Sequence, residues 1–355
     1  MIRPVEATPA RPAEAHAIDV ARGLPGERIV CTTVGRAQAA HCLATERPAA
    51  GVTAWFLDRY QHDLAVRSWG DSPSNLRSAC LPDLPPGPHD LTVIPLAKEG
   101  EAELSRDILQ QAMLNLEIGG RLVAAVDNPR DTWLREQLAG TGETVRVRPA
   151  AGPKPGAVAY VVEKTREPAK IRDFTCEVVF RDRERLLKVI TRPGVFAHRR
   201  IDPGARHLLN AVDMAADTRV LDIGCGSGAV AIGIAARDPS VQVHAIDSSA
   251  RAVDCTRRGA EINGLANVTV ALEAGGEVDE PGTYDLVLAN PPYYGDFRIA
   301  ELFVDAAWRA LAPGGTLLVV TKQPTWYVEH LPQRWLDVAR EEVKTYHLIE
   351  AVRPS

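Results

Sequence analysis

The chain has 355 residues, of which 45% are hydrophobic and 25% are charged, a composition that excludes disorder, collagen and coiled coil as whole-chain structures. Its length suggests two domains of about 150 residues, and its formal net charge of −5 argues against a uniformly basic coat for polyanions. No apolar run approaches the roughly 18–20 residues that a membrane span needs, so we expect no membrane association. The six cysteines show neither CxxC nor zinc spacing, so we expect no metal and reduced, buried thiols in a cytoplasmic protein.

The predicted elements repeat along the chain. Residues 90–100 resemble residues 285–295, and residues 116–129 resemble residues 311–324, both at an offset of 195 (285 − 90 and 311 − 116). Residues 28–37 match residues 219–228 at an offset of 191 (219 − 28). Strand signals alternate with helical segments in each copy, which predicts a parallel sheet covered on both faces. We therefore predict an α/β fold of two tandem Rossmann-like domains with mostly parallel seven-stranded sheets, residues 1–170 and 171–355.

The second copy has the clearer elements. Gly264 is a stop signal for the helix that begins near residue 249, and a later helix is expected to end at the glycines 314 and 315. The predicted strands are 219–224, 241–247, 267–273, 284–290 and 316–321, and the predicted helices are 229–238, 249–264 and 303–315.

A glycine-rich loop, DIGCGSG at residues 222–228, follows the first strand of the second copy. Gly224, Gly226 and Gly228 permit positive φ angles and a close approach of a ligand to the backbone at a helix N-terminus. Asp247 ends the next strand, where the ribose hydroxyls of a cofactor meet a carboxylate. A dinucleotide site is the alternative. Asp222 argues against it, because a dehydrogenase usually keeps an apolar strand residue at this position. The 127 residues after the loop (355 − 228) also leave no room for a substrate domain.

The NPPY segment, Asn290 to Tyr293, ends the fourth strand near the switch point of the predicted sheet. Pro291 and Pro292 lack N–H donors, so the turn presents carbonyl groups. The Asn290 amide oxygen and the Pro291 carbonyl are suited to accept the two hydrogens of an exocyclic amino group on guanine, adenine or a primary amide. Tyr293 is suited to stack on a planar base, which is worth about 1–3 kcal/mol. Cytosine C5 methylation is excluded, because it needs a Pro-Cys nucleophile and the chain has none.

Together, these motifs and the segment RPGVFAHRRIDPGARHLL at residues 192–209 resemble class I S-adenosylmethionine-dependent methyltransferases of the small-domain family. The resemblance implies guanine-N2 methylation of small-subunit ribosomal RNA and, often, a degenerate N-terminal copy of the fold. It also implies a cofactor pocket bordered by residues 195 and 196. The implied contacts of S-adenosylmethionine are Asp222, Gly224, Gly226, Gly228, Asp247 and Asn290, with Glu273 expected near the adenine. Asp202 is expected to cap a helix that begins with Pro203.

The first copy keeps the strands but not the site residues. Cys31, Thr33, Gly35 and Ala37 stand where the second copy has Asp222 and the three glycines. We therefore expect residues 1–170 to bind no cofactor and to act in folding or RNA recognition.

The charge is also unevenly spread, with −1 over residues 1–170, +4 over 171–206 and −8 over 207–355. We expect the basic segment to contact RNA, which the resemblance implies is ribosomal RNA or a ribosomal subunit. Glutamine-N5 methylation of a protein, adenine-N6 methylation and a catalytically silent RNA-binding factor remain alternatives. A monomer is expected, because two stacked copies in one chain imitate a dimer. The RNA-contacting side chains are expected to be Arg181, Arg183, Arg185, Lys188, Arg192, Arg199, Arg200 and Arg206.

Overall fold

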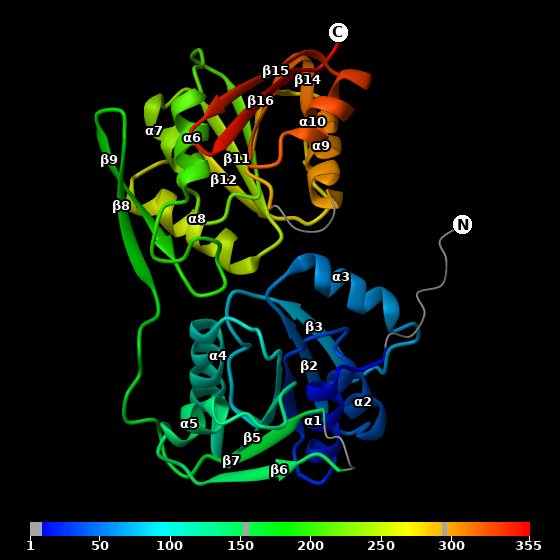
Figure 1. Cartoon of the computed structure of the whole chain (residues 1–355). Coiled ribbons are helices and arrows are strands. Elements are labelled where there is room, and N and C mark those ends of the chain that lie inside the picture. Colours follow the sequence, from blue (N-terminus) through cyan, green and yellow to red (C-terminus); the bar gives the residue numbers. More distant parts are fainter. Residues whose placement is uncertain (1–8, 152–155, 293–296) are drawn as a thin grey trace. The chain divides into compact units, whose positions relative to one another are not determined.

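The computed structural model describes residues 9–151, 156–292 and 297–355, and the chain divides into two compact units, Met1–Phe174 and Thr175–Ser355 (Figure 1). Within the described residues each unit contains a seven-stranded sheet, and the two sheets share one strand order, β3-β2-β1-β4-β5-β7-β6 and β12-β11-β10-β13-β14-β16-β15. Six strands of each sheet run in one direction, and one strand, β7 or β16, is antiparallel to both of its neighbours. The predicted pair of Rossmann-like α/β domains is confirmed.

The described elements of the first unit are the helices α1 (Pro12–Arg22), α2 (Gln38–Glu46), α3 (Arg59–Ser68), α4 (Ala102–Asn115) and α5 (Trp133–Ala139), and the strands β1 (Arg28–Cys31), β2 (Gly51–Phe56), β3 (Leu76–Cys80), β4 (His89–Leu96), β5 (Leu116–Val126), β6 (Val145–Pro149) and β7 (Val158–Glu163).

The second unit begins with a separate antiparallel hairpin, β8 (Cys176–Asp182) and β9 (Arg185–Thr191). The described elements that follow are α6 (Pro203–Ala211), β10 (Arg219–Ile223), α7 (Ala229–Arg237), β11 (Gln242–Asp247), α8 (Ala250–Ile262), β12 (Val268–Leu272), β13 (Tyr284–Ala289), α9 (Arg298–Ala310), β14 (Leu311–Thr321), α10 (Thr325–His330), a 3-10 turn (Leu331–Gln333), β15 (Leu336–Val343) and β16 (Tyr346–Val352).

One predicted boundary is wrong. The helix expected to reach the glycines 314 and 315 ends at Ala310, and β14 begins at the next residue. Leu311 is fully buried and pairs with Tyr284 of β13, so sheet pairing extends the backbone before the glycines are reached. Gly314 lies inside the strand with φ of 81°.

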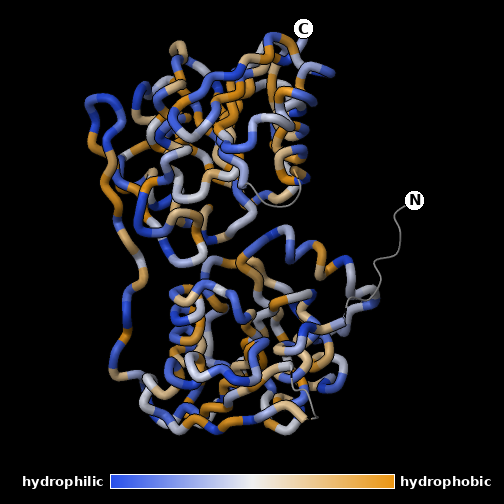
Figure 2. Tube along the Cα trace, in the orientation of Figure 1, coloured by the Kyte–Doolittle hydropathy of each residue, from blue (hydrophilic) through white to orange (hydrophobic). Residues whose placement is uncertain are grey.

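The core of each unit lies on both faces of its sheet, as expected for an α/β/α sandwich. In the first unit, one apolar cluster joins the sheet to α1 and α2, and a second joins it to α4 and α5. In the second unit, the corresponding clusters lie under α6 and α7 and under α9 and α10. Figure 2 shows the hydrophobic segments concentrated on the strands inside each unit.

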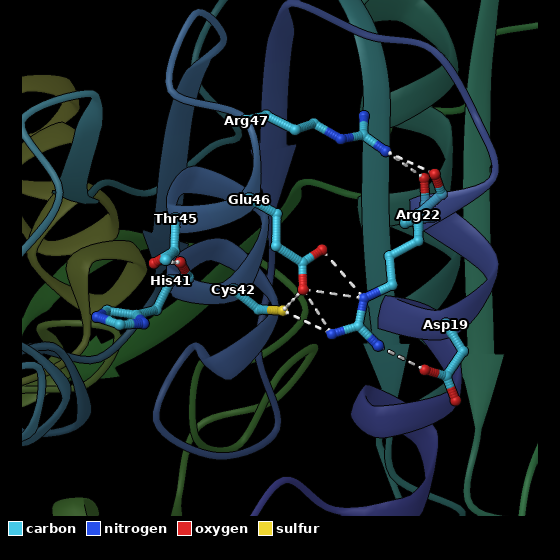
Figure 3. A network of polar contacts seen from close by, with 8 residues as sticks. Asp19, Arg22, His41, Cys42, Thr45, Glu46 and Arg47 are labelled. Atoms are coloured by element: carbon cyan, nitrogen blue, oxygen red, sulfur yellow. Dashed lines mark hydrogen bonds and ion pairs between the residues drawn. The ribbon is translucent and has the colours of Figure 1, made fainter.

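A polar network joins α1 to α2 in the first unit (Figure 3). The guanidinium group of Arg22 donates to the carboxylate of Glu46, to Asp19 and to the sulfur of Cys42. The side chain of Arg47 donates to the carbonyl oxygens of Ala21 and Arg22 in the last turn of α1. Burial raises the pKa of the Cys42 thiol, and the hydrogen bond to Glu46 raises it further, so this cysteine is a structural part of the network.

Candidate active site

Four neighbouring strands of the second sheet end at the same edge, and each is followed by a predicted site residue. The glycine loop follows β10, Asp247 ends β11, Glu273 follows β12 and Asn290 follows β13. The register confirms their proximity, because Ile223 pairs with both Ile246 and Ala289. Ligands of open α/β sheets bind at this carboxyl edge.

The glycine loop is shaped by hydrogen bonds to the neighbouring strand. The backbone N–H groups of Gly224 and Cys225 both donate to the carbonyl oxygen of Ile246, at 2.8 and 3.1 Å. Gly228 has φ of 79° at the N-cap of α7, and a β-carbon there would lie 2.8 Å from the side chain of Thr256. Gly226 has φ of 56°, and a β-carbon there would meet nothing within 4 Å. The loop is therefore packed from below, and its open side lies at Gly226.

Asp247 is bound to the glycine loop. One oxygen of its carboxylate accepts a hydrogen bond from Gly226 N at 2.9 Å, and the other accepts one from Ser249 N at 2.8 Å. This acid therefore lies against the loop. Each carboxylate oxygen has further lone pairs, so Asp247 keeps acceptor capacity for a ligand hydroxyl.

Asp222 lies beneath the loop and is only 3% exposed. Its carboxylate accepts a hydrogen bond from Ala231 N of α7 at 3.1 Å. Burial raises the pKa of Asp222 to about 7; the Ala231 N–H lowers it in part, and the charge of Asp247 adds to the rise. The two acids give this part of the site an electronegative character, which favours a cationic ligand.

Asn290 contacts the N-terminus of α6. Its Nδ2 donates to Oδ2 of Asp202 at 2.8 Å, and the same oxygen caps α6 by accepting from Ala205 N at 3.1 Å. A β-carbon on Gly204 would lie 3.0 Å from Oδ1 and 3.2 Å from Nδ2 of Asn290. The expected helix cap at Asp202 is confirmed, and its contact with Asn290 is a site feature that the sequence reading missed.

The two prolines that follow Asn290 border a small depression of about 10 Å³, which has room for about one water molecule. Thr321 and Gln323 contribute from the end of β14. Phe297 also borders it, and its ring stacks on Trp326 with centroids 5.8 Å apart, while Trp326 stacks on His330 at 4.8 Å. Aromatic rings therefore adjoin the NPP turn. Tyr293, the predicted stacking residue, lies outside the described residues.

Glu273 and Phe303 come from two further elements of the second unit. Glu273 follows β12, its backbone N–H donates to the carbonyl of Asp247 at 2.9 Å, and its carboxylate accepts from Gly275 N. Phe303 of α9 lies under the glycine loop, where a β-carbon on Gly224 would come within 3.0 Å of its ring. The sequence reading missed Phe303, because helical spacing alone does not distinguish a core aromatic from one that supports a ligand loop.

The basic segment is mostly exposed, as predicted, with one exception. Arg192 is 9% exposed, and it pairs with Asp254 at 3.5 Å, so it is not part of an RNA-facing surface. In the same loop Phe196 is 64% exposed, whereas Val195 is buried. The exposed cations of the segment are Arg181, Arg183, Arg185, Lys188, Arg199, Arg200 and Arg206.

Cys31, at the end of β1, and Cys225, in the glycine loop, are not suited to act as nucleophiles. Cys31 and Cys225 are buried, and burial raises the pKa of the Cys225 thiol far above its usual value. Cys255 is also buried, but Cys42, Cys80 and Cys176 are only half-buried, so the expectation that all six thiols are buried is wrong.

The corresponding loop of the first unit is occupied by side chains of its own chain. The hydroxyl of Thr33 accepts from the backbone N–H groups of Gly35 and Ala37, each at 2.9 Å. Glu14 of α1 is fully buried, and its carboxylate accepts from Ala39 N at 3.1 Å and from the hydroxyl of Thr33. Burial raises the pKa of Glu14. N–H groups that a ligand would need at this helix N-terminus are therefore already satisfied.

Among residues 9–151, 156–292 and 297–355, no group of three or more His, Cys, Asp or Glu side chains could hold a metal ion. In the same part of the chain, no helix has the length and apolar character to cross a membrane.

Comparisons with known proteins agree with this geometry. Residues 186–348 match the family model of the methyltransferase small domain. The chain is similar to ribosomal RNA small subunit methyltransferase C of Chromohalobacter salexigens, with 36% identity over 161 residues, which is 43% of this chain and 46% of that protein. It is also similar to the protein of the same name from Klebsiella pneumoniae, with 34% identity over 138 residues, 38% of this chain and 40% of that protein. The chain thus matches less than half the length of these relatives.

A solved structure of the T. thermophilus 16S rRNA N2 methyltransferase, in complex with AdoMet and guanosine, resembles the whole chain. The TM-score is 0.80 at 22% identity, and the likeness covers 99% of this chain and 93% of that one. At this identity the likeness establishes a shared two-unit fold. The family match spans the glycine loop and the Asn290 turn, so residues 186–348 are similar to the methyltransferase small domain family.

Proposed function

We propose that the chain transfers a methyl group from S-adenosylmethionine to an exocyclic amino nitrogen, with guanine N2 of ribosomal RNA as the acceptor. The observation that carries the proposal is the position of Asn290. It follows β13, directly beside the glycine loop of β10, and its amide is held by Asp202. An amide acceptor for the substrate is thus placed next to a loop suited to a nucleoside cofactor.

The residues at the carboxyl edge fit S-adenosylmethionine. Gly226 leaves open space above the loop, Asp247 can accept from ribose hydroxyls, and Glu273 lies one strand further for the adenine. When ionised, the buried Asp222 would favour a cationic group such as the methionine part of the cofactor. When bound, the cofactor supplies a methyl group that is already activated by its sulfonium charge.

The chain's own residues then align the acceptor. The amide oxygen of Asn290 and the carbonyl of Pro291 would accept the two hydrogens of the amino group, which would turn its lone pair toward the methyl group. Alignment of two bound reactants can supply about 7–11 kcal/mol of a barrier. The sulfur would keep the electron pair of the broken bond to the methyl group, and the methylated nitrogen would release its extra proton to water. The ring of Phe297, which borders the turn and stacks on Trp326, is suited to pack on the target base or on a neighbouring base.

The RNA contact is proposed for the exposed cations of the connector. Arg199 and Arg200 lie in the loop before α6, close in sequence to Asp202, which contacts Asn290. The exposed ring of Phe196 lies in the same loop. Exposed arginines interleaved with an aromatic ring are suited to an unpaired RNA segment. The names of the two curated relatives support ribosomal RNA as the substrate. Because the proposed substrate is ribosomal RNA, we place the reaction in the cytoplasm.

For the first unit we propose no cofactor site and a role in folding or RNA recognition. The support is the filling of its loop by Thr33 and Glu14. The loop keeps its backbone form, because Ala37 has φ of 55° at the position that corresponds to Gly228. Its ligand-facing N–H groups, however, bind side chains.

The test is transfer of a tritiated methyl group from S-adenosylmethionine to deproteinised ribosomal RNA, free ribosomal subunits and release factors, followed by nucleoside analysis. We expect the label in N2-methylguanosine of the RNA or the subunits. Label only in protein would favour glutamine-N5 methylation, and label in N6-methyladenosine would favour adenine. No transfer to any acceptor, with RNA binding intact, would favour a silent assembly factor.

A further inference from the structure

The contact between Asp202 and Asn290 joins two segments that are distant in sequence. Oδ2 of Asp202 lies 2.8 Å from Nδ2 of Asn290 and 3.1 Å from the backbone nitrogen of Ala205. One oxygen therefore caps α6 and binds the side chain of the NPP turn. Both side chains are half-buried, so the contact is partly shielded from water.

The chemistry of the two groups fixes the orientation of the Asn290 amide. A carboxylate has no hydrogen to donate, so only the –NH₂ end of the amide can face Asp202. The carbonyl oxygen Oδ1, on the other branch of the amide, is then the atom left for a substrate. A charge-assisted hydrogen bond to the –NH₂ group also increases the negative charge on Oδ1, which makes it a better acceptor.

We propose that Asp202 is a positioning residue, which holds the Asn290 amide with Oδ1 turned toward the acceptor amine of the substrate. This inference rests on the proposed methyl transfer and adds a residue to it. Without Asp202 the side-chain amide can rotate by 180°. Its –NH₂ group would then face the substrate amine, and two hydrogen-bond donors would oppose each other.

Gly204 is the second residue that supports the contact between Asp202 and Asn290. A β-carbon at this position would lie 2.7 Å from Oδ2 of Asp202 and 3.0 Å from Oδ1 of Asn290. The absence of a side chain lets the amide lie flat against the first turn of α6. Gly204→Ala should therefore separate the pair, although alanine is the better residue for a helix.

A role limited to helix capping makes a different prediction from a positioning role. Serine caps helices about as well as aspartate, but its side chain is too short to keep the bond to Asn290. Asparagine can cap and can still offer an oxygen to Nδ2. Asp58 is the matched control, because it caps α3 by accepting from Gln61 N at 2.9 Å and lies in the other unit.

The experiment compares Asp202→Ser, Asp202→Asn, Gly204→Ala and Asp58→Ser in the full chain, measuring kcat, the Kd of S-adenosylmethionine and thermal unfolding. We expect Asp202→Ser and Gly204→Ala to lower kcat by about 10- to 100-fold, as is typical for partners that orient a functional group. The Kd of the cofactor should stay within a few-fold. Asp202→Asn should keep most of the activity, and Asp58→Ser should not change kcat.

Two further readouts separate positioning from a general structural effect. In an Asn290→Ala background, Asp202→Ser should cause no further loss, because the two residues act as one unit. The Asn290 side-chain amide signal, assigned by its absence in Asn290→Ala, should show slow hydrogen exchange in the wild type and fast exchange in Asp202→Ser.

The outcomes are distinct. If wild-type protein methylates no acceptor, the proposed function fails, and the amide-exchange comparison still decides the positioning role. If wild-type protein is active and Asp202→Ser keeps its kcat, or if its loss multiplies with that of Asn290→Ala, positioning is overturned. Equal exchange of the Asn290 amide in the two proteins would also overturn it.

Discussion

The buried carboxyl group of Asp222 lowers the stability of the folded protein by an amount that depends on pH. Its pKa is raised from 3.8 to about 7 by burial, so the folded protein holds a proton that the unfolded chain releases between these values. Since the folded state then binds more protons, its stability increases as the pH falls from about 7 toward 4. This is the reverse of the usual behaviour of a paired acid.

We expect Asp222→Asn to stabilise the ligand-free second unit at pH 8, because it removes an ionised group from a buried position. The expected gain is about 4 kcal/mol, with little gain at pH 4, where Asp222 is already protonated. Urea unfolding at the two pH values measures this, and Glu261→Gln, at an exposed position of α8, is the control. Equal effects of Asp222→Asn at both pH values would contradict the raised pKa.

Asn290 is the residue on which the proposed chemistry depends. We expect Asn290→Ala to lower kcat by about 100- to 1,000-fold, the loss typical when one preorganised hydrogen-bonding group is removed. Cofactor binding should remain within a few-fold of wild type, because the glycine loop, Asp222 and Asp247 are untouched. Single-turnover methyl transfer and calorimetry provide the two measurements. Full activity of this variant would refute the proposed role of the turn.

At the scale of elements, an ion pair with both partners buried fixes the β8–β9 hairpin to the second unit. Nε and Nη2 of Arg237 bind the two carboxylate oxygens of Asp182 at 2.8 and 2.9 Å, and the two side chains are 6% and 5% exposed. Arg237 ends α7 and also donates to the carbonyl oxygens of Leu209 and Val212 at the end of α6. One guanidinium group thus joins a strand and two helices.

We expect Asp182→Ala to destabilise the second unit by about 3–5 kcal/mol, because it leaves the Arg237 charge buried without its partner. Lys188 offers a matched comparison on the same hairpin, since it pairs with Glu177 at 2.8 Å with both side chains about half exposed. Lys188→Ala should cost less than about 1 kcal/mol. Denaturant unfolding measures both, and equal costs would show that burial of the Asp182 pair is not what matters.

In the whole molecule, the same fold occurs twice, but the loop after the first strand of the sheet order's central pair differs between the two units in what occupies it. The glycine loop of the second unit leaves open space at Gly226, whereas the loop of the first unit is filled by Thr33 and the buried Glu14. We expect the full chain to bind one molecule of S-adenosylmethionine. Isothermal titration calorimetry measures the stoichiometry, and Gly226→Trp, which fills the open space, should abolish binding. Two molecules per chain would contradict the proposal for the first unit.

The uneven charge of the chain predicts that the cations of the connector contribute to RNA binding. We expect the double change Arg199→Glu and Arg200→Glu to weaken RNA binding and to reduce its dependence on salt, by about 0.7 in the log–log slope for each lost phosphate contact. The control is Arg340→Glu with Lys344→Glu, which makes the same change of charge at exposed positions on β15 and the turn after it. Equal effects of the two pairs would remove the connector from the RNA interface.

The fold could be predicted from the sequence, and candidate site residues could be named, because both depend on local patterns. Alternating strands and helices predict a doubly covered parallel sheet, and repeats at offsets of 191 and 195 predict its duplication. The glycines, Asp247 and Asn290 were found because each lies at the end of a strand, and parallel strands end at a common edge. The end of α9 was missed, because pairing of Leu311 with Tyr284 outweighs the local helix signal.

The neighbours of these residues could be identified only from the folded structure. The bond between Asp202 and Asn290 spans 88 positions, and the filling of the first loop by Glu14 depends on how α1 packs. The burial of Arg192 and the raised pKa of Asp222 depend on the same kind of information. Hydrogen bonds between distant segments and the exclusion of water arise only when the chain has folded, so no local pattern in the sequence records them.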